Sequence, residues 1–148
     1  MSPLYFPPFL VFIWTFIILV AGCTSDAQAF LYNQVIHFQV EFAPNFRDLL
    51  ITNDIHFTKE FYVIQKIGHI VAFGILYFFL LHWIKRHGNA FILCGTFALY
   101  TEILQLFFSR NGRFFDVGVD MVGILISYFL SRNFYVNSEE DSVTEYYV

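Results

Sequence analysis

Residues 65–84 read QKIGHIVAFGILYFFLLHWI, and from position 67 to position 84 this stretch contains no Asp, Glu, Lys or Arg. An α-helix needs about 20 predominantly apolar residues to cross the hydrocarbon core of a membrane. Three further apolar stretches, residues 9–21, 90–108 and 117–134, are of comparable character, although the first is short and the last contains Asp120. The sequence therefore predicts an all-α integral membrane bundle of about four transmembrane helices.

The composition favours the same class of protein. Of the 148 residues, 57% are hydrophobic and 14% are charged, against roughly 25% charged in soluble domains. The formal net charge is −4 and the eight Lys and Arg residues are scattered, so the chain lacks the basic stripe of a nucleic-acid-binding protein. The two cysteines have neither the spacing of a zinc site nor that of a disulfide framework.

Polar segments separate and follow the apolar stretches. Residues 24–65 carry mixed charges with an apolar thread, which favours one or two short helices lying on the outer membrane surface. Gly88 and Asn89 predict a tight turn between the second and third helices. Residues 135–148 are acidic and polar, which predicts a disordered cytoplasmic tail after a single membrane domain, residues 1–134.

The distribution of basic residues predicts an orientation. Lys85, Arg86 and His87 occupy the short turn between the second and third helices, and compact basic loops favour the cytoplasm. Both chain termini are then cytoplasmic and the long polar segment is outside, in a multi-pass protein of the cell membrane. Residues 20–23, ending in Cys23, match a lipoprotein cleavage site, but residues 1–8 lack the positive charge of a secretory signal.

Ionisable and amide side chains gather near the ends of three predicted helices. Because helices two and three are antiparallel, the start of helix two, the end of helix three and the start of helix four meet at one membrane face. The spacing of these residues also places neighbours on common helix faces. We therefore predict one polar site formed by Lys66, His69, Glu102, Gln105, Arg110, Asp116 and Asp120.

The predicted site is balanced in charge. An unpaired Asp, Lys or Arg at the bilayer centre costs about 3 kcal/mol even on the lower estimates, so cancellation is a condition for burial. Gly123 follows on the face of Asp120 and offers a small surface for close helix packing. With His69 titratable, three cations oppose three anions: Lys66, Arg110 and Arg113 against Glu102, Asp116 and Asp120.

The order and spacing of these residues resemble the VanZ-like family of small bacterial membrane proteins, over residues 65–130. The resemblance implies a multi-pass plasma-membrane protein linked to low-level resistance to teicoplanin-type glycopeptides, and it implies no known reaction. Family members commonly carry a Ser-Ser-Gln-Pro-like segment after the first helix, where this chain has residues 22–26, GCTSD. Four motifs carry the resemblance: Lys66-x-x-His69, Glu102-x-x-Gln105, Arg110, and Asp116-x-x-x-Asp120-x-x-Gly123.

Three functions are compatible with such a site. In the first, Lys66 and Arg110 bind the phosphate or carboxylate of an amphiphile, with membrane lipids, a lipid-linked cell-wall precursor or a glycopeptide as partners. The second is a membrane-embedded hydrolase or transferase, in which the acids and His69 hold a divalent metal or act as acid and base. The third, transport of a small solute or proton, is disfavoured because the polar residues are confined to one face.

Whether the chain is an enzyme stays open at this point. The sequence has no His-rich ligand set, no Ser or Cys nucleophile beside a base and no phosphate-binding Gly loop, so we assign no cofactor and no metal. Structural readings stand beside the functional ones: a snorkelling Lys66, an interhelical clamp of Glu102 and Gln105, a capping Asp116 and a headgroup-binding Arg113. The oligomeric state is likewise not determined by the sequence.

Overall fold

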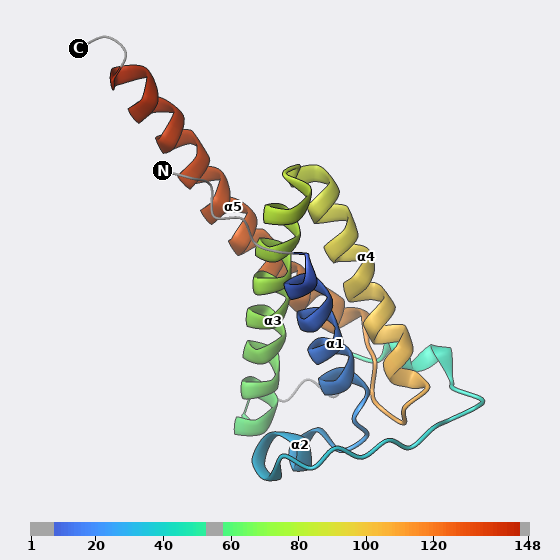
Figure 1. Cartoon of the computed structure of the whole chain (residues 1–148). Helices are drawn as coiled ribbons and strands as arrows, with labels where there is room; N and C mark the ends of the chain where they lie inside the picture. Colours follow the sequence, from blue (N-terminus) through green and yellow to red (C-terminus); the bar gives the residue numbers. More distant parts are fainter. Residues whose placement is uncertain (1–7, 53–57, 146–148) are drawn as a thin grey trace.

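The computed structural model describes residues 8–52 and 58–145, and the side chains among these up to Asn133. Within them every regular secondary-structure element is a helix (Figure 1). The elements are α1 (Phe9–Cys23), α2 (Ala27–Asn33), the 3₁₀-helix η1 (Phe46–Leu50), α3 (Glu60–Ile84), α4 (His87–Leu106) and α5 (Phe114–Glu145). The predicted all-α fold class is confirmed.

Three helical segments are long and apolar enough to cross a membrane: Glu60–Ile84, His87–Leu106 and Phe114–Asn133. Helix α1 has 15 residues, and it passes as a fourth span only when joined to α2, from which it is bent by 119°. Large apolar side chains such as Phe12, Phe16 and Ile92 are exposed on the outside of the bundle, where lipid can cover them. The chain is a multi-pass membrane protein with three or four spans.

The structure moves two of the predicted helix boundaries. Helix α3 begins at Glu60, seven residues before the predicted start, because residues 61–64 are apolar and continue its buried face into the polar segment. The predicted turn at Gly88 and Asn89 is wrong, since both residues lie in the first turn of α4. The chain instead reverses at Lys85, which adopts the left-handed conformation (φ 59°) and donates its backbone N–H to the carbonyl of Leu81.

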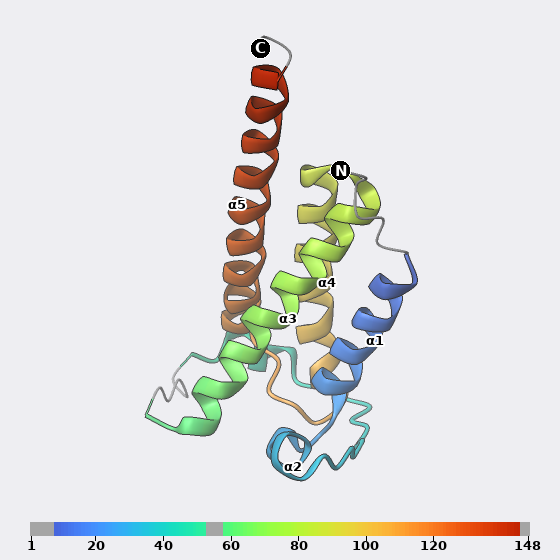
Figure 2. The same cartoon turned by 60° about the vertical axis from the view of Figure 1, so that its left-hand side comes forward.

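The C-terminal segment also differs from the prediction. Helix α5 continues to Glu145 and extends beyond the α3–α4 turn (Figure 2), so the backbone of residues 135–145 is helical where the composition predicted a disordered tail. Between Ile124 and Glu145 there is no Gly or Pro to end a helix that has already formed across the membrane. Residues 146–148 of the predicted tail lie outside the described residues.

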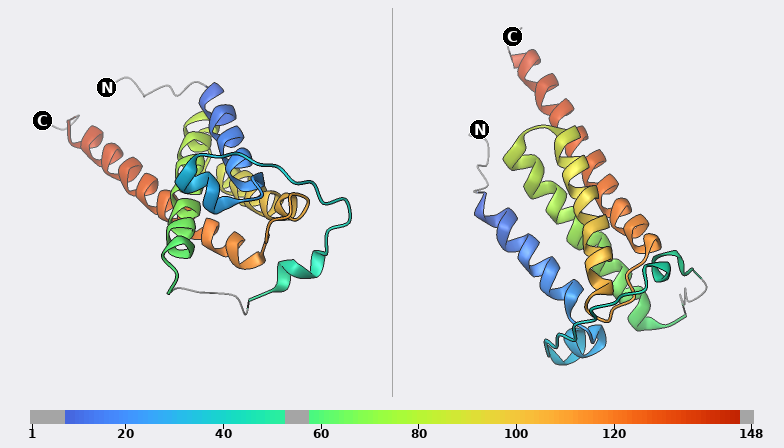
Figure 3. Two further views of the ribbon diagram at one scale, coloured as in Figure 1. Left: turned by 90° about the horizontal axis from the view of Figure 1, so that it is seen from below. Right: turned by 90° about the vertical axis from the view of Figure 1, so that its right-hand side faces the viewer.

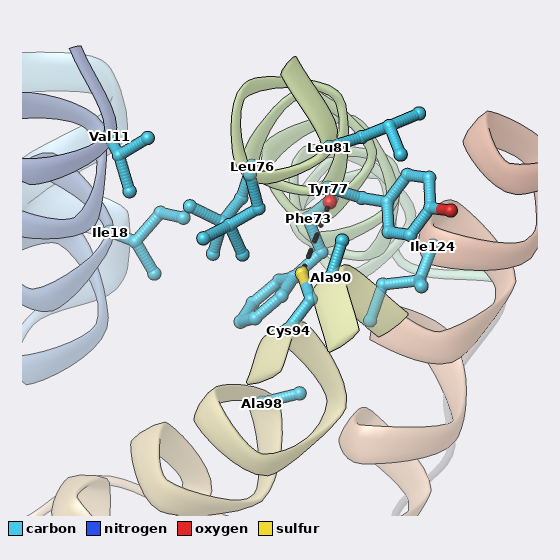
Figure 4. Packing of buried hydrophobic residues seen from close by; sticks show 11 residues of the cluster. Val11, Ile18, Phe73, Leu76, Tyr77, Leu81, Ala90, Cys94, Ala98 and Ile124 are labelled. Atoms are coloured by element: carbon cyan, nitrogen blue, oxygen red, sulfur yellow. Dashed lines mark hydrogen bonds between the residues drawn. The ribbon is translucent and has the colours of Figure 1, made fainter. Parts of the chain in front are cut away.

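Helix α3 is the centre of the bundle and packs against α1, α4 and α5. Figure 4 shows the buried cluster, in which Ala90, Cys94 and Ala98 follow one another on the same face of α4. These small side chains bring α4 close to α3, and the Cys94 thiol lies 3.7 Å from the carbonyl oxygen of Phe73. Trp14 of α1 donates its indole N–H to a carbonyl of α3, which attaches α1 to the bundle.

Gly123 is a point of very close approach between α3 and α5. A Cβ atom at this position would lie 2.1 Å from the carbonyl oxygen of Ile70, a separation that no side chain tolerates. The predicted small packing face is therefore confirmed, and it sets the distance between the two helices that carry Lys66, His69, Asp116 and Asp120.

The polar segment between α1 and α3 covers one end of the bundle (Figure 3). Its short helices α2 and η1 are joined by an extended stretch, in which Glu41 donates its backbone N–H to the carbonyl of Phe107 at the end of α4. The α4–α5 connection lies at this same end, opposite the α3–α4 turn (Figure 1). The segment thus contains two short helices, within the predicted one or two.

Candidate functional site

Two hydrogen-bonded pairs join α3 to α5 at the covered end of the bundle. The Lys66 ammonium donates to Oδ1 of Asp116, and both side chains are at least nine-tenths buried. One turn deeper, Nδ1 of His69 lies 2.8 Å from Oδ1 of Asp120. The pairing follows from helix geometry, because residues three or four apart lie on the same face. Because α3 begins at Glu60, Lys66 and His69 lie within the helix and not at its exposed start.

Glu102 of α4 is fully buried beside these pairs. Its Oε1 accepts a hydrogen bond of 2.9 Å from Nε2 of Gln105, and its Oε2 accepts one of 2.9 Å from the backbone N–H of Arg113. The second bond requires the α4–α5 connection to touch α4, and Gly112 permits this: a Cβ there would lie 1.9 Å from the carbonyl oxygen of Glu102. The carboxylate is thus held by donors from two elements.

Arg110 attaches the first helix to the site. Its Nη1 donates a 2.7 Å hydrogen bond to the carbonyl oxygen of Thr24, the residue after α1. Ser25 adds a bond of 2.9 Å to the carbonyl of Phe108. Burial lowers the pKa of the Arg110 guanidinium, and the carboxylates of Glu102 and Asp116 oppose that shift. A guanidinium remains charged in proteins, so a positive charge lies at this junction.

The sequence did not identify Thr24 as part of the site, although it is fully buried. The signal available was the short polar run of residues 22–26 directly after an apolar helix, which departs from the family pattern. Arg113, which the sequence allowed as a headgroup contact, is only 7% exposed. Its backbone N–H donates the hydrogen bond to Oε2 of Glu102. The charge-balanced cluster is therefore joined to the polar segment through main-chain groups that composition does not reveal.

The deepest part of the cluster combines three elements. His69, Glu102 and Asp120 each offer a donor atom, and these atoms lie within 4.8 Å of one another. Asp120 is fully buried, and its Oδ2 has no hydrogen-bond partner among the residues that the structure describes. All seven predicted site residues are thus brought to one end of the bundle, in pairs that the sequence did not specify.

Two cavities meet at this cluster. The first is polar, has a volume of about 800 Å³, and is bordered by Lys66, Arg110 and Asp116. The second has a volume of about 200 Å³, is lined mostly by apolar side chains of α1, α2 and α3, and reaches His69 and Gln105. Arg110 borders both cavities. The site therefore offers charged and apolar surfaces side by side.

The other histidines that the structure describes lie away from this cluster. The side chain of His87 lies 2.9 Å from the hydroxyl of Tyr77, in the half of the bundle near the α3–α4 turn. His37 is exposed in the polar segment and contributes backbone bonds with Thr24.

A helical membrane bundle with a buried, charge-paired cluster at one end defines the class of this protein. A family model described as VanZ/LLP1 matches residues 8–135. The chain belongs to this family. It is also 37% identical to a protein named "Uncharacterized membrane protein YwnJ" from Bacillus subtilis (strain 168). The alignment spans 117 residues, which are 78% of this chain and 82% of the relative. No solved structure matches the chain significantly.

Proposed function

We propose that this VanZ/LLP1-family protein binds an anionic amphiphile at one face of the cell membrane. The observation that supports this function is the junction of the two cavities at Arg110. A phosphate or carboxylate headgroup would occupy the polar cavity, and an acyl or prenyl chain would lie in the apolar one. The polar cavity has the volume typical of small-molecule sites, roughly 300–1,000 Å³.

The charges that line the polar cavity favour an anion. Lys66 is bonded to Asp116, and Asp26 accepts the backbone N–H of Ala29 in the first turn of α2. Arg110 uses one of its five N–H donors on Thr24 and borders both cavities, so it is the principal anion ligand in this proposal. Four cations and three anions line the cavity: Lys59, Lys66, Arg110 and Arg113, against Asp26, Glu60 and Asp116.

The orientation is part of the proposal. Lys85 and Arg86 form the turn at the end opposite the cavities, and His87 begins α4 there. The positive-inside rule favours the cytoplasm for this basic turn. The cavities then open on the outer face, where lipid-linked cell-wall precursors and glycopeptides are found. A cysteine introduced at Gly88 should resist an impermeant maleimide on intact cells, while one at Asn111 should react. Labelling of Gly88→Cys alone would reverse the orientation.

Lipid titration of the purified, detergent-solubilised protein tests the binding function. Phosphatidylglycerol should bind more tightly than phosphatidylcholine of equal chain length, and Arg110→Gln should abolish the difference. A hydrogen bond to a charged group is worth about 1.5–3 kcal/mol, so we expect at least a roughly tenfold loss of affinity. Equal affinity for the two lipids in the wild-type protein would refute the proposal.

Arg47→Gln is the matched control for this titration. Arg47 lies on η1 at the same end of the bundle, is exposed, and borders neither cavity. We expect Arg47→Gln to leave phosphatidylglycerol affinity unchanged. Arg110→Lys retains the charge without the guanidinium fork, and it should fall between wild type and Arg110→Gln. An equal loss in Arg47→Gln and Arg110→Gln would indicate general surface electrostatics instead of a site.

A role in low-level resistance to teicoplanin-type glycopeptides belongs to the same proposal. An outward site for anionic amphiphiles would act either on the antibiotic or on the envelope component that it recognises. Deletion of the gene should lower the inhibitory concentration of such glycopeptides, and complementation with the wild type, but not with Arg110→Gln, should restore it. Unchanged susceptibility to every glycopeptide would remove this role while leaving lipid binding to be judged by titration.

A further inference from the structure

We propose that His69, Glu102 and Asp120 form a binding site for a divalent transition-metal ion, with Zn²⁺ as the best match. The three donors come from α3, α4 and α5, and their ligand atoms lie within 4.8 Å of one another. One imidazole nitrogen with two carboxylates is a donor set suited to zinc. The site does not depend on amphiphile binding, and neither the family nor the relative assigns it.

The state of Asp120 supports a ligand at this point. A purely structural clamp would satisfy both carboxylate oxygens, because a buried polar atom without a partner is destabilising. Oδ1 of Asp120 is bonded to His69, yet Oδ2 has no hydrogen-bond partner in the described part of the chain, although the residue is fully buried. A cation between the three side chains would supply that partner and offset the charges of both carboxylates.

The surroundings resemble the outer shell of a metal site. Ligating carboxylates in proteins are oriented by further hydrogen bonds, and Glu102 accepts one from Gln105 and one from the backbone of Arg113. Asp116 is excluded from the ligand set because it is bonded to Lys66. The inferred ligand set is therefore smaller than the set that the sequence allowed, which combined His69 with the three acids Glu102, Asp116 and Asp120.

Binding requires a small contraction of the donor triangle. Around a tetrahedral zinc with bonds of about 2.1 Å, two donors lie roughly 3.4 Å apart, which is closer than the widest separation in the structure. His69 is the ligand with freedom to move, since its side chain is 17% exposed while that of Asp120 is fully buried. Three protein ligands leave a coordination position for water or for an oxygen of a molecule in the apolar cavity that His69 lines.

Metal analysis of the full chain tests this site. The protein is purified in detergent through a tag without histidine, treated with EDTA, desalted, and dialysed separately against Zn²⁺, Mn²⁺ and Co²⁺. We expect one equivalent of zinc per chain, with affinity at least tenfold lower in Asp120→Asn and in His69→Gln. His37→Gln and Asp48→Asn replace exposed or partly exposed residues at the same end of the bundle, and they should retain the wild-type stoichiometry.

Two measurements keep the test decisive. If the site variants fail to fold, the visible spectrum of the Co²⁺-loaded wild-type protein decides: intense low-symmetry d–d bands support the site, and the spectrum of hydrated cobalt overturns it. Retention of wild-type zinc affinity by either site variant, or no stoichiometric uptake of the three ions by folded wild-type protein, also overturns it. Lipid titration in EDTA is read separately, so failure of the metal site is distinguishable from failure of amphiphile binding.

Discussion

Replacing Gly123 by Ala should separate the two helices that form the site. The added Cβ would lie 2.1 Å from the carbonyl oxygen of Ile70, about 0.9 Å inside the 3.0 Å limit that real Cβ atoms respect. A backbone carbonyl cannot rotate away, so α3 and α5 must move apart. Overpacking of this kind costs about 1–3 kcal/mol, and the rigid obstacle places Gly123→Ala near the upper end of that range.

Gly118→Ala is the matched control for this substitution. Gly118 lies on the same helix, and a Cβ there would meet nothing within 4 Å. Alanine in place of an unconstrained helical glycine stabilises by roughly 0.5–1 kcal/mol. The two variants should therefore differ in free energy of unfolding by roughly 1.5–4 kcal/mol, with Gly123→Ala the less stable.

Titration with SDS in mixed micelles, followed by tryptophan fluorescence, measures this difference. Asp120, which is bonded to His69, lies within one turn of Gly123 on α5. The affinity of the proposed site for Zn²⁺ should therefore fall in Gly123→Ala even under conditions where the protein stays folded. If Gly123→Ala and Gly118→Ala unfold at the same SDS fraction, the close approach of α3 and α5 does not stabilise the bundle, and this reasoning is refuted.

Three further substitutions test other contacts by the same titration. Lys66→Met leaves Asp116 buried without its partner and should cost about 3 kcal/mol, whereas the double variant Lys66→Met/Asp116→Leu should recover most of that loss; equal losses would contradict a coupled pair. Gly112→Ala should cost about 1–3 kcal/mol and displace Glu102, whose carbonyl oxygen would lie 1.9 Å from the new Cβ. Trp14→Phe removes the indole hydrogen bond between α1 and α3 and should cost about 1 kcal/mol, and an unchanged stability would show that this hydrogen bond does not hold α1 to the bundle.

Much of the site followed from the sequence because helix spacing and antiparallel packing are local rules. Lys66 with His69, and Asp116 with Asp120, had to share helix faces, and apolar spans must bring opposite ends of successive helices to the same membrane face. The gathering of seven polar residues therefore needed no tertiary information. The functional role of each residue is a separate matter, which the proposed experiments address.

The partners within the cluster depended on helix rotation and on loops. The sequence suggested that Lys66 and Arg110 act together on an anion, whereas Lys66 is bonded to Asp116 and Arg110 to the backbone of Thr24. Main-chain acceptors and donors such as these have no signature in side-chain composition. The cavities were equally beyond prediction, because their walls combine α1 and α2 with residues of α3 and of the α4–α5 connection.

The sequence by itself determined that this chain crosses a membrane as helices and that the polar residues of the site gather at one end, because bilayer thickness and the energy of an unpaired charge leave few alternatives. The tertiary structure decided which charge meets which. Contact at Gly123 and Gly112 sets the separation and register of α3, α4 and α5, and a shift of about 1 Å between packed helices is enough to exchange hydrogen-bond partners.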